Sequence, residues 1–455
     1  MPLSVVVLAA GQGKRMCSDL PKVLQPVAGR PMLAHVLNKA RELDPAALYV
    51  VYGHGGDLVR EQFPDPDLHW CLQAEQLGTG HAVSQALPDI PDEHCVLILC
   101  GDVPLIDPAS MRGLADGGAE HELALLTALL EDPSGYGRIA RDADGHVDRI
   151  VEDGDASAAE RQIHEINTGL MAVRAVHLKR WLAALDNDNA QAEYYLTDIV
   201  RMARAEGRHV AALTAHDAAS VLGINDKLQL AQAERSYQRA VAEELMRAGV
   251  TLADPARLDV RGELTVGRDV FIDVNAVFEG RVELGDGVHI GPNCVISDAR
   301  LGDETVLHAN IVMAGVETGA RCELGPFARL RPGTVLADRV KVGNFVEIKK
   351  STVASGSKIN HLTYVGDTVM GSGVNVGAGT ITCNYDGAGK HLTNIGDGAF
   401  IGSGVMLVAP IDIGAGATIG AGSVLTQAAP ANQLTLARPK QVTVKGWQRP
   451  VKTPK

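Results

Sequence analysis

Glycines and basic residues follow the first apolar segment of the chain in the order expected of a phosphate-binding loop. The segment VVVLAAGQGKRM is followed shortly by LPKVL, which places Gly11 and Gly13 directly after a predicted buried strand. Glycines at such a turn allow backbone N–H groups to approach a phosphate, and Arg15 and Lys22 can neutralise its charge. The turn alone is weak evidence, because an ordinary strand-to-helix turn with solvated basic side chains has a similar composition.

A second group of polar residues interrupts a six-residue repeat in the C-terminal half. Large aliphatic residues recur at every sixth position from Leu324 to Ile348 and from Ile395 to Leu425, but the rhythm slips between these two runs. This period, with glycine after the aliphatic residue, is typical of a parallel β-helix with about 18 residues per coil. The polar residues in and just before the interruption are Arg331, Lys349, His361, Tyr364, Asn375, Asn384 and Tyr385.

Each of these polar residues also has a plain structural interpretation. A single histidine such as His361 is more often structural than catalytic, although a neutral imidazole is a suitable general base near pH 7. Arg331 and Lys349 could bind a phosphate, or they could belong to a solvated face of the β-helix. The residue types alone do not decide between these alternatives.

The elements that must position both groups fall into two domains joined by a helix. Residues 1–227 alternate short apolar runs with helical patterns, which predicts a Rossmann-like α/β domain with a mainly parallel sheet. Residues 228–248 contain neither Gly nor Pro and are rich in helix-forming residues, so we expect one long linker helix. Residues 249–455 are predicted to form a left-handed parallel β-helix of hexapeptide repeats, ending in an irregular basic tail.

Composition narrows the class of protein. The formal net charge of -13 argues against a protein that binds nucleic acid or a membrane surface. The 7 cysteines have no CxxC pair, which favours reduced thiols in the cytoplasm over disulfides or a zinc site. The apolar N-terminus lacks a basic leader region, and no apolar stretch reaches transmembrane length, so we expect no stable membrane insertion.

The N-terminal motifs, LAAGxGxRM with PKxL shortly after, resemble those of the sugar-nucleotide pyrophosphorylases. The resemblance implies that Lys22 and Arg15 are catalytic and that Asp102 and Asn225 bind Mg²⁺, with Asp102 at the end of an apolar strand. It also implies a binding site for UTP and UDP-N-acetylglucosamine. The implied residues of that site are Leu8, Ala9, Ala10, Gly11, Lys22, Gln73, Gly78, Thr79, Cys100, Gly101, Asp102, Gly137, Glu152, Asn167 and Asn225.

The segments KINHLTYVGD and GAGTITCNYDG, together with the N-terminal motifs, resemble the bacterial bifunctional family that combines glucosamine-1-phosphate N-acetyltransferase and N-acetylglucosamine-1-phosphate uridylyltransferase activities. The resemblance implies that His361 is the general base that accepts a proton from the glucosamine amine. It implies a glucosamine 1-phosphate site at Arg331, Lys349, Tyr364 and Asn375. Acetyl-CoA, the co-substrate, is implied to contact Ala378, Asn384, Tyr385, Ser403, Ala421 and Arg438, between the subunits of a homotrimer.

Two alternatives and two departures from the family pattern accompany this interpretation. The chain could be a sugar nucleotidyltransferase that makes an ADP- or GDP-sugar and has an inactive hexad tail, or a scaffold subunit without catalysis. Cys100 stands where the resembled enzymes often have an aromatic residue, and Lys14 stands where threonine is frequent. We expect these departures to alter affinity rather than abolish activity, and we assign no covalent role to Cys383.

Overall fold

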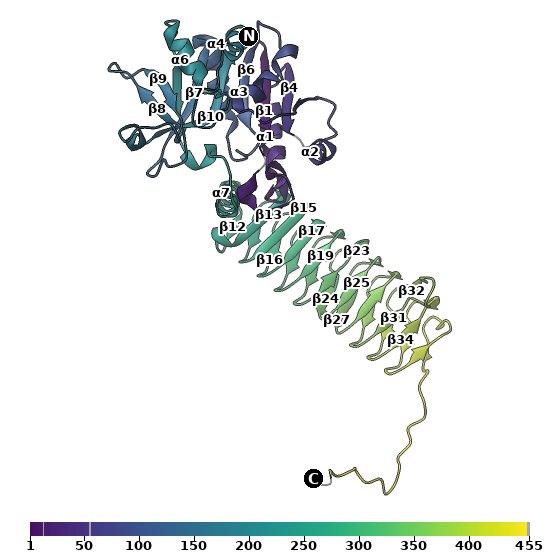
Figure 1. The fold of residues 1–455 in the computed structure, drawn as a ribbon. Coiled ribbons are helices and arrows are strands. Elements are labelled where there is room, and N and C mark those ends of the chain that lie inside the picture. The colour runs from purple at the N-terminus through teal and green to yellow at the C-terminus, as the bar shows by residue number, and fades with distance from the viewer. Residues whose placement is uncertain (12, 54–55, 453–455) are drawn as a thin grey trace. The chain divides into compact units, whose positions relative to one another are not determined.

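The computed structural model describes residues 1–11, 13–53 and 56–452. The chain divides into two compact units, Met1–Tyr237 and Gln238–Lys455. Figure 1 shows the first unit as a sheet with helices on both faces and the second as a stack of short strands. The predicted fold class, a Rossmann-like α/β domain followed by a left-handed parallel β-helix, is confirmed.

The sheet of the first unit is mixed, and its strands β6, β1, β4 and β5 run parallel to one another. Its order is β11-β7-β10-β6-β1-β4-β5, with β10 antiparallel to both β6 and β7, and with β8 and β9 attached to β10 as a hairpin. The strands are β1 (Leu3–Ala9), β4 (Ala47–Gly53), β5 (Leu68–Gln73), β6 (Cys95–Cys100), β7 (Leu123–Leu129), β8 (Arg138–Arg141), β9 (Val147–Val151), β10 (Glu165–Arg174) and β11 (Ala211–Thr214), and β2 (Pro26–Val27) pairs separately with β3 (Arg30–Pro31).

Helices cover both faces of this sheet because successive strand side chains point to opposite sides. Val5 and Val7 of β1 belong to one core cluster, and Val6 belongs to the other. The first cluster includes residues of α1, α2 and α4, and the second includes residues of α3, α5 and α6. These helices are α1 (Met32–Arg41), α2 (Asp57–Gln62), α3 (Thr79–Ser84), α4 (Pro108–His121), α5 (Ala175–Ala183) and α6 (Asp198–Ala205). Short 3₁₀ helices are η1 (Lys14–Met16), η2 (Lys22–Leu24), η3 (Leu87–Asp89), η4 (Glu160–Gln162) and η5 (Ala218–Val221).

The long helix α7 spans Lys227–Arg247. The division between the two units falls within it, after Tyr237, whereas the sequence predicts a separate linker helix over residues 228–248. In the second unit the buried Gln238 side chain donates to the carbonyl of Val260 at 2.9 Å and accepts from its N–H at 2.7 Å. These two bonds satisfy backbone groups of strand β13 (Leu258–Val266) and attach the middle of the helix to the first coil.

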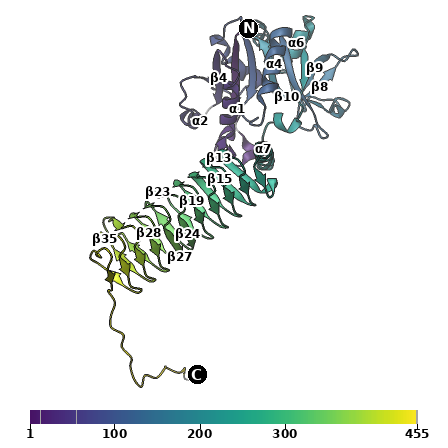
Figure 2. The same cartoon turned by 180° about the vertical axis from the view of Figure 1, so that it is seen from behind.

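The second unit is a parallel β-helix whose coils contribute strands to three faces (Figure 2). The first face contains β12 (Thr251–Leu252), β14 (Phe271–Ile272), β16 (His289–Ile290), β18 (Val306–Leu307), β21 (Glu323–Leu324), β24 (Lys341–Asn344), β27 (Lys358–His361), β30 (Asn375–Val376), β33 (Phe400–Ile401), β36 (Thr418–Ile419) and β38 (Leu434–Thr435). The second contains β19 (Val312–Ala314), β22 (Arg329–Leu330), β25 (Glu347–Lys349), β28 (Tyr364–Gly366), β31 (Ile381–Cys383), β34 (Met406–Val408) and β37 (Val424–Leu425).

The third face contains β20 (Val316–Thr318), β23 (Thr334–Leu336), β26 (Thr352–Val353), β29 (Thr368–Met370), β32 (Thr393–Ile395) and β35 (Ile411–Ile413). Near the start of the β-helix the long strands β13 (Leu258–Val266), β15 (Ala276–Leu284) and β17 (Val295–Leu301) continue from the second face to the third. A short 3₁₀ helix, η6 (Pro255–Arg257), precedes them, and residues 436–452 form no helix or strand.

The predicted interruption after Ile348 is smaller in the structure than in the sequence. Strands β26 to β31 continue the stack in register, with Val353 and Met370 buried at the aliphatic positions. The six-residue count fails there because a corner can be turned in five residues when one of them, such as Lys350 or Asp367, has a positive φ. The true excursion is residues 384–392, which join β31 to β32 along the chain. The stack continues past the excursion, because β31 pairs directly with β34.

Candidate active sites

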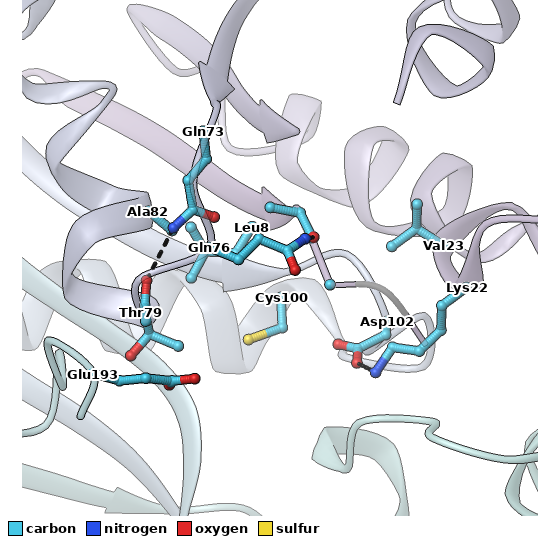
Figure 3. Close-up of a pocket in the computed structure, with 13 residues that line it drawn as sticks. Leu8, Lys22, Val23, Gln73, Gln76, Thr79, Ala82, Cys100, Asp102 and Glu193 are labelled. Atoms are coloured by element: carbon cyan, nitrogen blue, oxygen red, sulfur yellow. Dashed lines mark hydrogen bonds and ion pairs between the residues drawn. The ribbon is translucent and has the colours of Figure 1, made fainter. Parts of the chain in front are cut away.

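A cavity of about 280 Å³ lies at the carboxyl ends of β1, β5 and β6, the edge of a parallel sheet where ligands usually bind. Figure 3 shows Gln73 and Thr79 at one end of this cavity, Lys22 and Asp102 at the other, and Cys100 between them. The residues that line the cavity are Leu8, Ala10, Gly11, Lys22, Val23, Gln73, Gln76, Gly78, Thr79, Ala82, Cys100, Asp102 and Glu193. Nine of these were predicted from the sequence, and Val23, Gln76, Ala82 and Glu193 were not.

Lys22 connects the two predicted metal ligands. Its ammonium forms an ion pair with Asp102 and donates to the amide oxygen of Asn225 at 2.9 Å. The Lys22 and Asp102 side chains are only 12% and 16% exposed, so the pair is largely shielded from water. A carboxylate oxygen and an amide oxygen therefore converge on one cationic group, and both are oxygen ligands of the kind that Mg²⁺ prefers.

Asn225 comes from a distant part of the chain and is held by local hydrogen bonds. Its amide nitrogen donates to the carbonyl of Gly223 at 3.1 Å, which orients its oxygen toward Lys22. The N–H of Ile224 donates to the carbonyl of Asp102 at 2.9 Å. Gln229 and Asp226 then cap the start of α7, because Gln229 accepts from the N–H of Asn225 at 2.7 Å and donates its own N–H to Asp226 at 2.8 Å.

The loop that carries Lys22 depends on glycine and on a buried amide. A Cβ at Gly13, which has φ +61°, would come within 2.6 Å of the Lys22 Cβ, so only glycine allows this approach. Gln25 is buried and donates to Ser18 and to the carbonyl of Leu20, at 3.1 Å in each case. Its side-chain oxygen accepts from Lys227 of α7 at 2.5 Å, which ties the Lys22 loop to the helix that follows Asn225.

The opposite end of the cavity presents amide and main-chain groups. Gln73 donates to the carbonyl of Gly78 at 3.1 Å, and the Thr79 hydroxyl accepts from the N–H of Leu196 at 3.1 Å. Gln76 donates to the carbonyl of Ala10. Sequence reasoning missed Gln76 because one glutamine in a loop carries no motif.

Cys100 lies at the centre of the lining and is not poised for reaction. Burial, and secondarily the nearby Asp102, raise the pKa of its thiol to about 12. It is therefore a neutral thiol at physiological pH, and its effect on the cavity is one of size and polarity. All 7 cysteines are free.

Three predicted sugar contacts lie close to one another beside the hairpin β8–β9. The N–H of Asn167 donates to the carbonyl of Gly137 at 2.8 Å, and a Cβ on Gly137 would lie 3.4 Å from a Glu152 carboxylate oxygen. Burial raises the pKa of Glu152, while its hydrogen bond from the Thr197 hydroxyl at 2.8 Å acts in the opposite direction. None of the three lines the first cavity, and Glu152 lines a separate cavity of about 370 Å³.

Other predicted residues of the first site lie outside the cavity lining. Ala9 is buried at the end of β1, and Gly101 donates its N–H to the carbonyl of Leu8 at 2.9 Å. Both therefore support the cavity through the backbone. Arg15, in η1, is exposed and does not line the cavity.

In the second unit, His361 ends β27 and lies exposed on the surface. Its Nδ1 is 3.1 Å from the amide oxygen of Asn344, its partner on the neighbouring strand. When Nδ1 carries the hydrogen and donates to Asn344, the lone pair of Nε2 is free to accept a proton. Asn344 was not predicted, and its position one coil below His361 is the signal that could have revealed it.

Basic side chains gather on the second face, around Lys349. The neighbouring Lys390, with burial and Arg331 as further causes, lowers the pKa of Lys349. Arg331 also donates to Glu347 at 2.8 Å. Lys390 was missed from the sequence because it lies in the 384–392 excursion, which brings it back to Lys349.

The excursion is held by a few specific contacts. Hydrogen bonds from the backbone N–H groups of Gly389 and Ala388 and from the His391 ring hold the pKa of Asp386 well below its usual range. Tyr385 forms an isolated bridge with Lys390, and its hydroxyl donates to the carbonyl of Gly387 at 2.7 Å. The excursion therefore presents Lys390 beside the second face.

Three other predicted residues have structural partners. The side chain of Asn384 is buried and donates to Asp367 at 2.5 Å. A Cβ on Gly366 would come within 2.5 Å of the Tyr364 hydroxyl and 2.8 Å of the Asn384 amide, so these two groups lie together over Gly366. Asn375 pairs with Lys358 and Phe400 on the first face.

Four of the six predicted acetyl-CoA contacts form one column that starts at His361, whereas Asn384 and Tyr385 lie in the excursion. Successive coils are linked by bonds from the N–H of Gly379 to the His361 carbonyl, from Gly404 to Ala378 and from Gly422 to Ser403. Arg438 then donates to the carbonyl of Ala421 at 2.9 Å. Coils are spaced by about 4.8 Å, so the small residues Ala378, Ser403 and Ala421 leave a narrow track along the stack.

Comparison with known proteins agrees with both halves of this arrangement. Residues 5–144 match the family model of the MobA-like NTP transferase domain, and residues 264–298 and 392–427 match the bacterial transferase hexapeptide model. The Bifunctional protein GlmU of Alkalilimnicola ehrlichii is 57% identical over 99% of this chain and 97% of its own length. The chain belongs to the GlmU family of bifunctional proteins.

Two further GlmU proteins show the same full-length similarity. Those of Marinobacter nauticus and Azoarcus sp. are 56% and 57% identical, cover 99% of this chain, and are themselves covered over 99% and 100% of their length. As a GlmU protein, the chain is a bifunctional enzyme with a nucleotidyltransferase domain and a hexapeptide acyltransferase domain. This favours the bifunctional interpretation over an inactive hexad tail or a scaffold subunit.

Among residues 1–11, 13–53 and 56–452, no helix is both long and apolar enough to cross a membrane.

Proposed function

We propose that the chain makes UDP-N-acetylglucosamine in two steps, one in each unit. The second unit transfers an acetyl group from acetyl-CoA to glucosamine 1-phosphate, and the first joins the product to UTP and releases pyrophosphate. The observation that carries the proposal is that one chain holds two separate sets of groups. Lys22, Asp102 and Asn225 converge in the first unit, and His361 heads a column of small residues in the second.

In the acetyl transfer, the glucosamine amine attacks the thioester carbonyl carbon while Nε2 of His361 accepts its proton. The amine nitrogen forms the new amide bond, and the bond from carbon to sulfur breaks so that coenzyme A leaves as a thiolate, which the proton held by His361 can convert to the free thiol. Asn344 keeps the ring oriented with Nδ1–H as a donor. Arg331, Lys349 and Lys390 supply three positive charges for the 1-phosphate, and the column from Ala378 to Ala421, with Arg438, accommodates acetyl-CoA.

In the uridylyl transfer, an oxygen of the sugar 1-phosphate attacks the α-phosphorus of UTP and pyrophosphate leaves. Such a reaction depends on positioning and charge neutralisation more than on covalent chemistry. Lys22 and Arg15 neutralise the phosphates, and Gln73, Gly78 and Thr79 bind the base. Gly137, Glu152 and Asn167 orient the sugar.

Mg²⁺ is the cation proposed for the first unit. The fit rests on the convergence of the Asp102 carboxylate and the Asn225 amide oxygen on the Lys22 ammonium. When bound, Mg²⁺ would supply positive charge next to the phosphate oxygens.

We further propose a homotrimer, supported by an exposed apolar corner of the β-helix. Phe327, Phe345 and Leu362 occupy equivalent positions on successive coils, are 51%, 56% and 60% exposed, and all have positive φ values. The two phenylalanine rings stack with centroids 5.5 Å apart. Large apolar side chains are unfavourable at solvent-exposed positions and at positive φ, so a partner surface that covers them is the simplest reason for their presence. Leu362 follows His361 directly, which places the proposed interface beside the acetyl-transfer site.

The proposed setting is the bacterial cytoplasm, where the product would serve peptidoglycan and lipopolysaccharide synthesis. Acetyl-CoA and UTP are cytoplasmic metabolites, and free thiols suit that compartment. Nucleic acid is not expected as a partner of a chain with formal net charge -13.

A coupled assay tests the proposal directly. Glucosamine 1-phosphate, acetyl-CoA, UTP and Mg²⁺ are supplied together, and free thiol and pyrophosphate are measured separately. We expect thiol release first and pyrophosphate release only from the acetylated product. Omitting acetyl-CoA should remove both signals, and adding N-acetylglucosamine 1-phosphate should restore pyrophosphate alone. Thiol release without pyrophosphate, or pyrophosphate release without prior acetylation, would contradict the proposed sequence.

A further inference from the structure

The ammonium of Lys22 occupies the point where the two metal-binding oxygens meet. The ammonium forms an ion pair with Asp102 and donates a hydrogen bond to the amide oxygen of Asn225 at 2.9 Å. Neither the Lys22 nor the Asp102 side chain is more than 16% exposed. A phosphate ligand would instead need the Lys22 ammonium directed into the cavity. One cationic side chain therefore has two possible positions, and the first coincides with that of the proposed Mg²⁺.

We propose that Lys22 is an internal counter-ion of the metal site, which holds Asp102 and Asn225 together until a divalent cation displaces it. The displaced ammonium then becomes available to the nucleotide phosphates. This inference rests on the proposed uridylyl-transfer function and assigns to its metal site a built-in order, in which metal entry precedes the engagement of Lys22 with phosphate.

The surrounding contacts indicate that only the side chain moves. Gln25 fixes the loop through Ser18, Leu20 and Lys227, at 3.1, 3.1 and 2.5 Å. Asn225 is fixed independently by Gly223 and by the capped start of α7. Because both backbones are tied down, rotation about the Lys22 side-chain bonds is the simplest route by which the ammonium can leave.

Electrostatics gives the direction of the effect. A positive charge in contact with both oxygens opposes the entry of a second cation, and this repulsion is stronger in a site that is largely shielded from water. Removing it should therefore strengthen metal binding by the free enzyme. The opposite is expected once nucleotide is present, because Lys22 then neutralises phosphate.

The test measures Mn²⁺ binding to the full chain by electron paramagnetic resonance of free Mn²⁺, at pH 8 and without nucleotide. Lys22→Met should bind Mn²⁺ at least about tenfold more tightly than the wild type. Lys22→Arg, which keeps the charge, and Lys14→Met, which removes an exposed charge from the same loop, should both remain near the wild-type affinity. Adding UTP should reverse the order, so that Lys22→Met binds Mn²⁺ with UTP more weakly than the wild type.

The outcomes that would overturn the proposal are distinct. Unchanged or weaker Mn²⁺ binding by Lys22→Met without UTP would show that Lys22 does not compete with the metal. An equal gain in Lys14→Met would show a general effect of net charge. Urea unfolding followed by the fluorescence of Trp70 and Trp181, both in the first unit, reports whether that unit is folded in each variant. If the wild type fails to release pyrophosphate, the proposed uridylyl transfer fails, while the Mn²⁺ comparison still decides the role of Lys22.

Discussion

The two units build their sites in different ways from comparable numbers of residues. In the first unit, side chains from distant segments meet in a cavity, and Lys22, Asp102 and Asn225 are joined by direct contacts. In the second, groups stand on the surface of a stack, and position along the chain fixes their neighbours one coil away. His361 is exposed, and its ring partner Asn344 lies 17 residues earlier, at the adjacent position of the preceding coil.

This difference shows where each site is vulnerable. The cavity depends on many long-range contacts within one chain, so it can be complete in a single subunit. The surface site lies on a flat stack, so residues of the 384–392 excursion or of a neighbouring subunit are needed to enclose a substrate.

Replacing the proposed base should abolish the activity of the second unit and leave that of the first unit intact. His361→Ala should lower kcat for acetyl transfer by about 10²–10⁴-fold, because the amine loses its proton acceptor. Uridylyl transfer from added N-acetylglucosamine 1-phosphate should stay within about twofold of wild type, since no contact of the first unit is removed. Thiol and pyrophosphate release measure the two rates, and Asp102→Ala should show the reverse pattern. Loss of both activities in either variant would show that the sites are not independent.

Disrupting the apolar corner should damage only the surface site. In Phe327→Ser/Phe345→Ser we expect dissociation to monomers at micromolar concentration, because two exposed anchors of the proposed interface are lost, and a fall of at least about tenfold in acetyl transfer. Light scattering and thiol release measure these effects. Val369→Ser is a matched control, since Val369 is 49% exposed on a different face. A monomeric double variant with full acetyl transfer would show that the site is complete in one chain.

Removing a half-buried charge from the first unit should stabilise it. Burial raises the pKa of Glu152, so the folded state binds its proton more tightly than the unfolded state. Stability therefore falls as pH rises from the ordinary glutamate pKa to the raised folded pKa, and this contribution is constant at higher pH. Glu152→Gln keeps an acceptor for Thr197 and removes this penalty. The free energy of unfolding should rise by about 1 kcal/mol at pH 8.

The gain in Glu152→Gln should shrink toward pH 5 and vanish in more acid solution, where the wild-type carboxyl is protonated in both states. Urea unfolding followed by Trp70 and Trp181 fluorescence measures it. A pH-independent gain would show that the carboxyl carries no desolvation cost. We also expect weaker sugar binding in this variant, which would appear as a raised KM for N-acetylglucosamine 1-phosphate.

The smallest effect is expected in a side-chain ladder of the β-helix. Asn293 has φ 60°, accepts from Asn275 at 2.9 Å and donates to Asn310 at 3.3 Å. Asn293→Ala should cost about 1 kcal/mol, because alanine tolerates this conformation poorly and makes neither bond. Asn293→Gly should cost less, since glycine accepts a positive φ. Urea unfolding of the β-helix measures both variants, and an equal loss in the two would assign the cost to the hydrogen bonds alone.

Much of this architecture could be read from the sequence because its causes are local. The hexads directly specify which side chain turns inward at each face, so the β-helix followed from the recurrence of residues such as Ile401, Leu407 and Ile413. The loop with Gly11 and Gly13 was recognisable because a tight turn after a strand needs glycine. The helix over Lys227–Arg247 followed from composition.

The tertiary structure decided what depends on contacts between distant residues. No local pattern brings Lys390 back to Lys349 or puts Asn344 beside His361. The five-residue corners were mistaken for an interruption, because a positive φ at Lys350 or Asp367 is a backbone choice that residue type does not reveal. The position of Lys22 between Asp102 and Asn225 joins segments some 200 residues apart, and only the packed fold brings those oxygens to one cation.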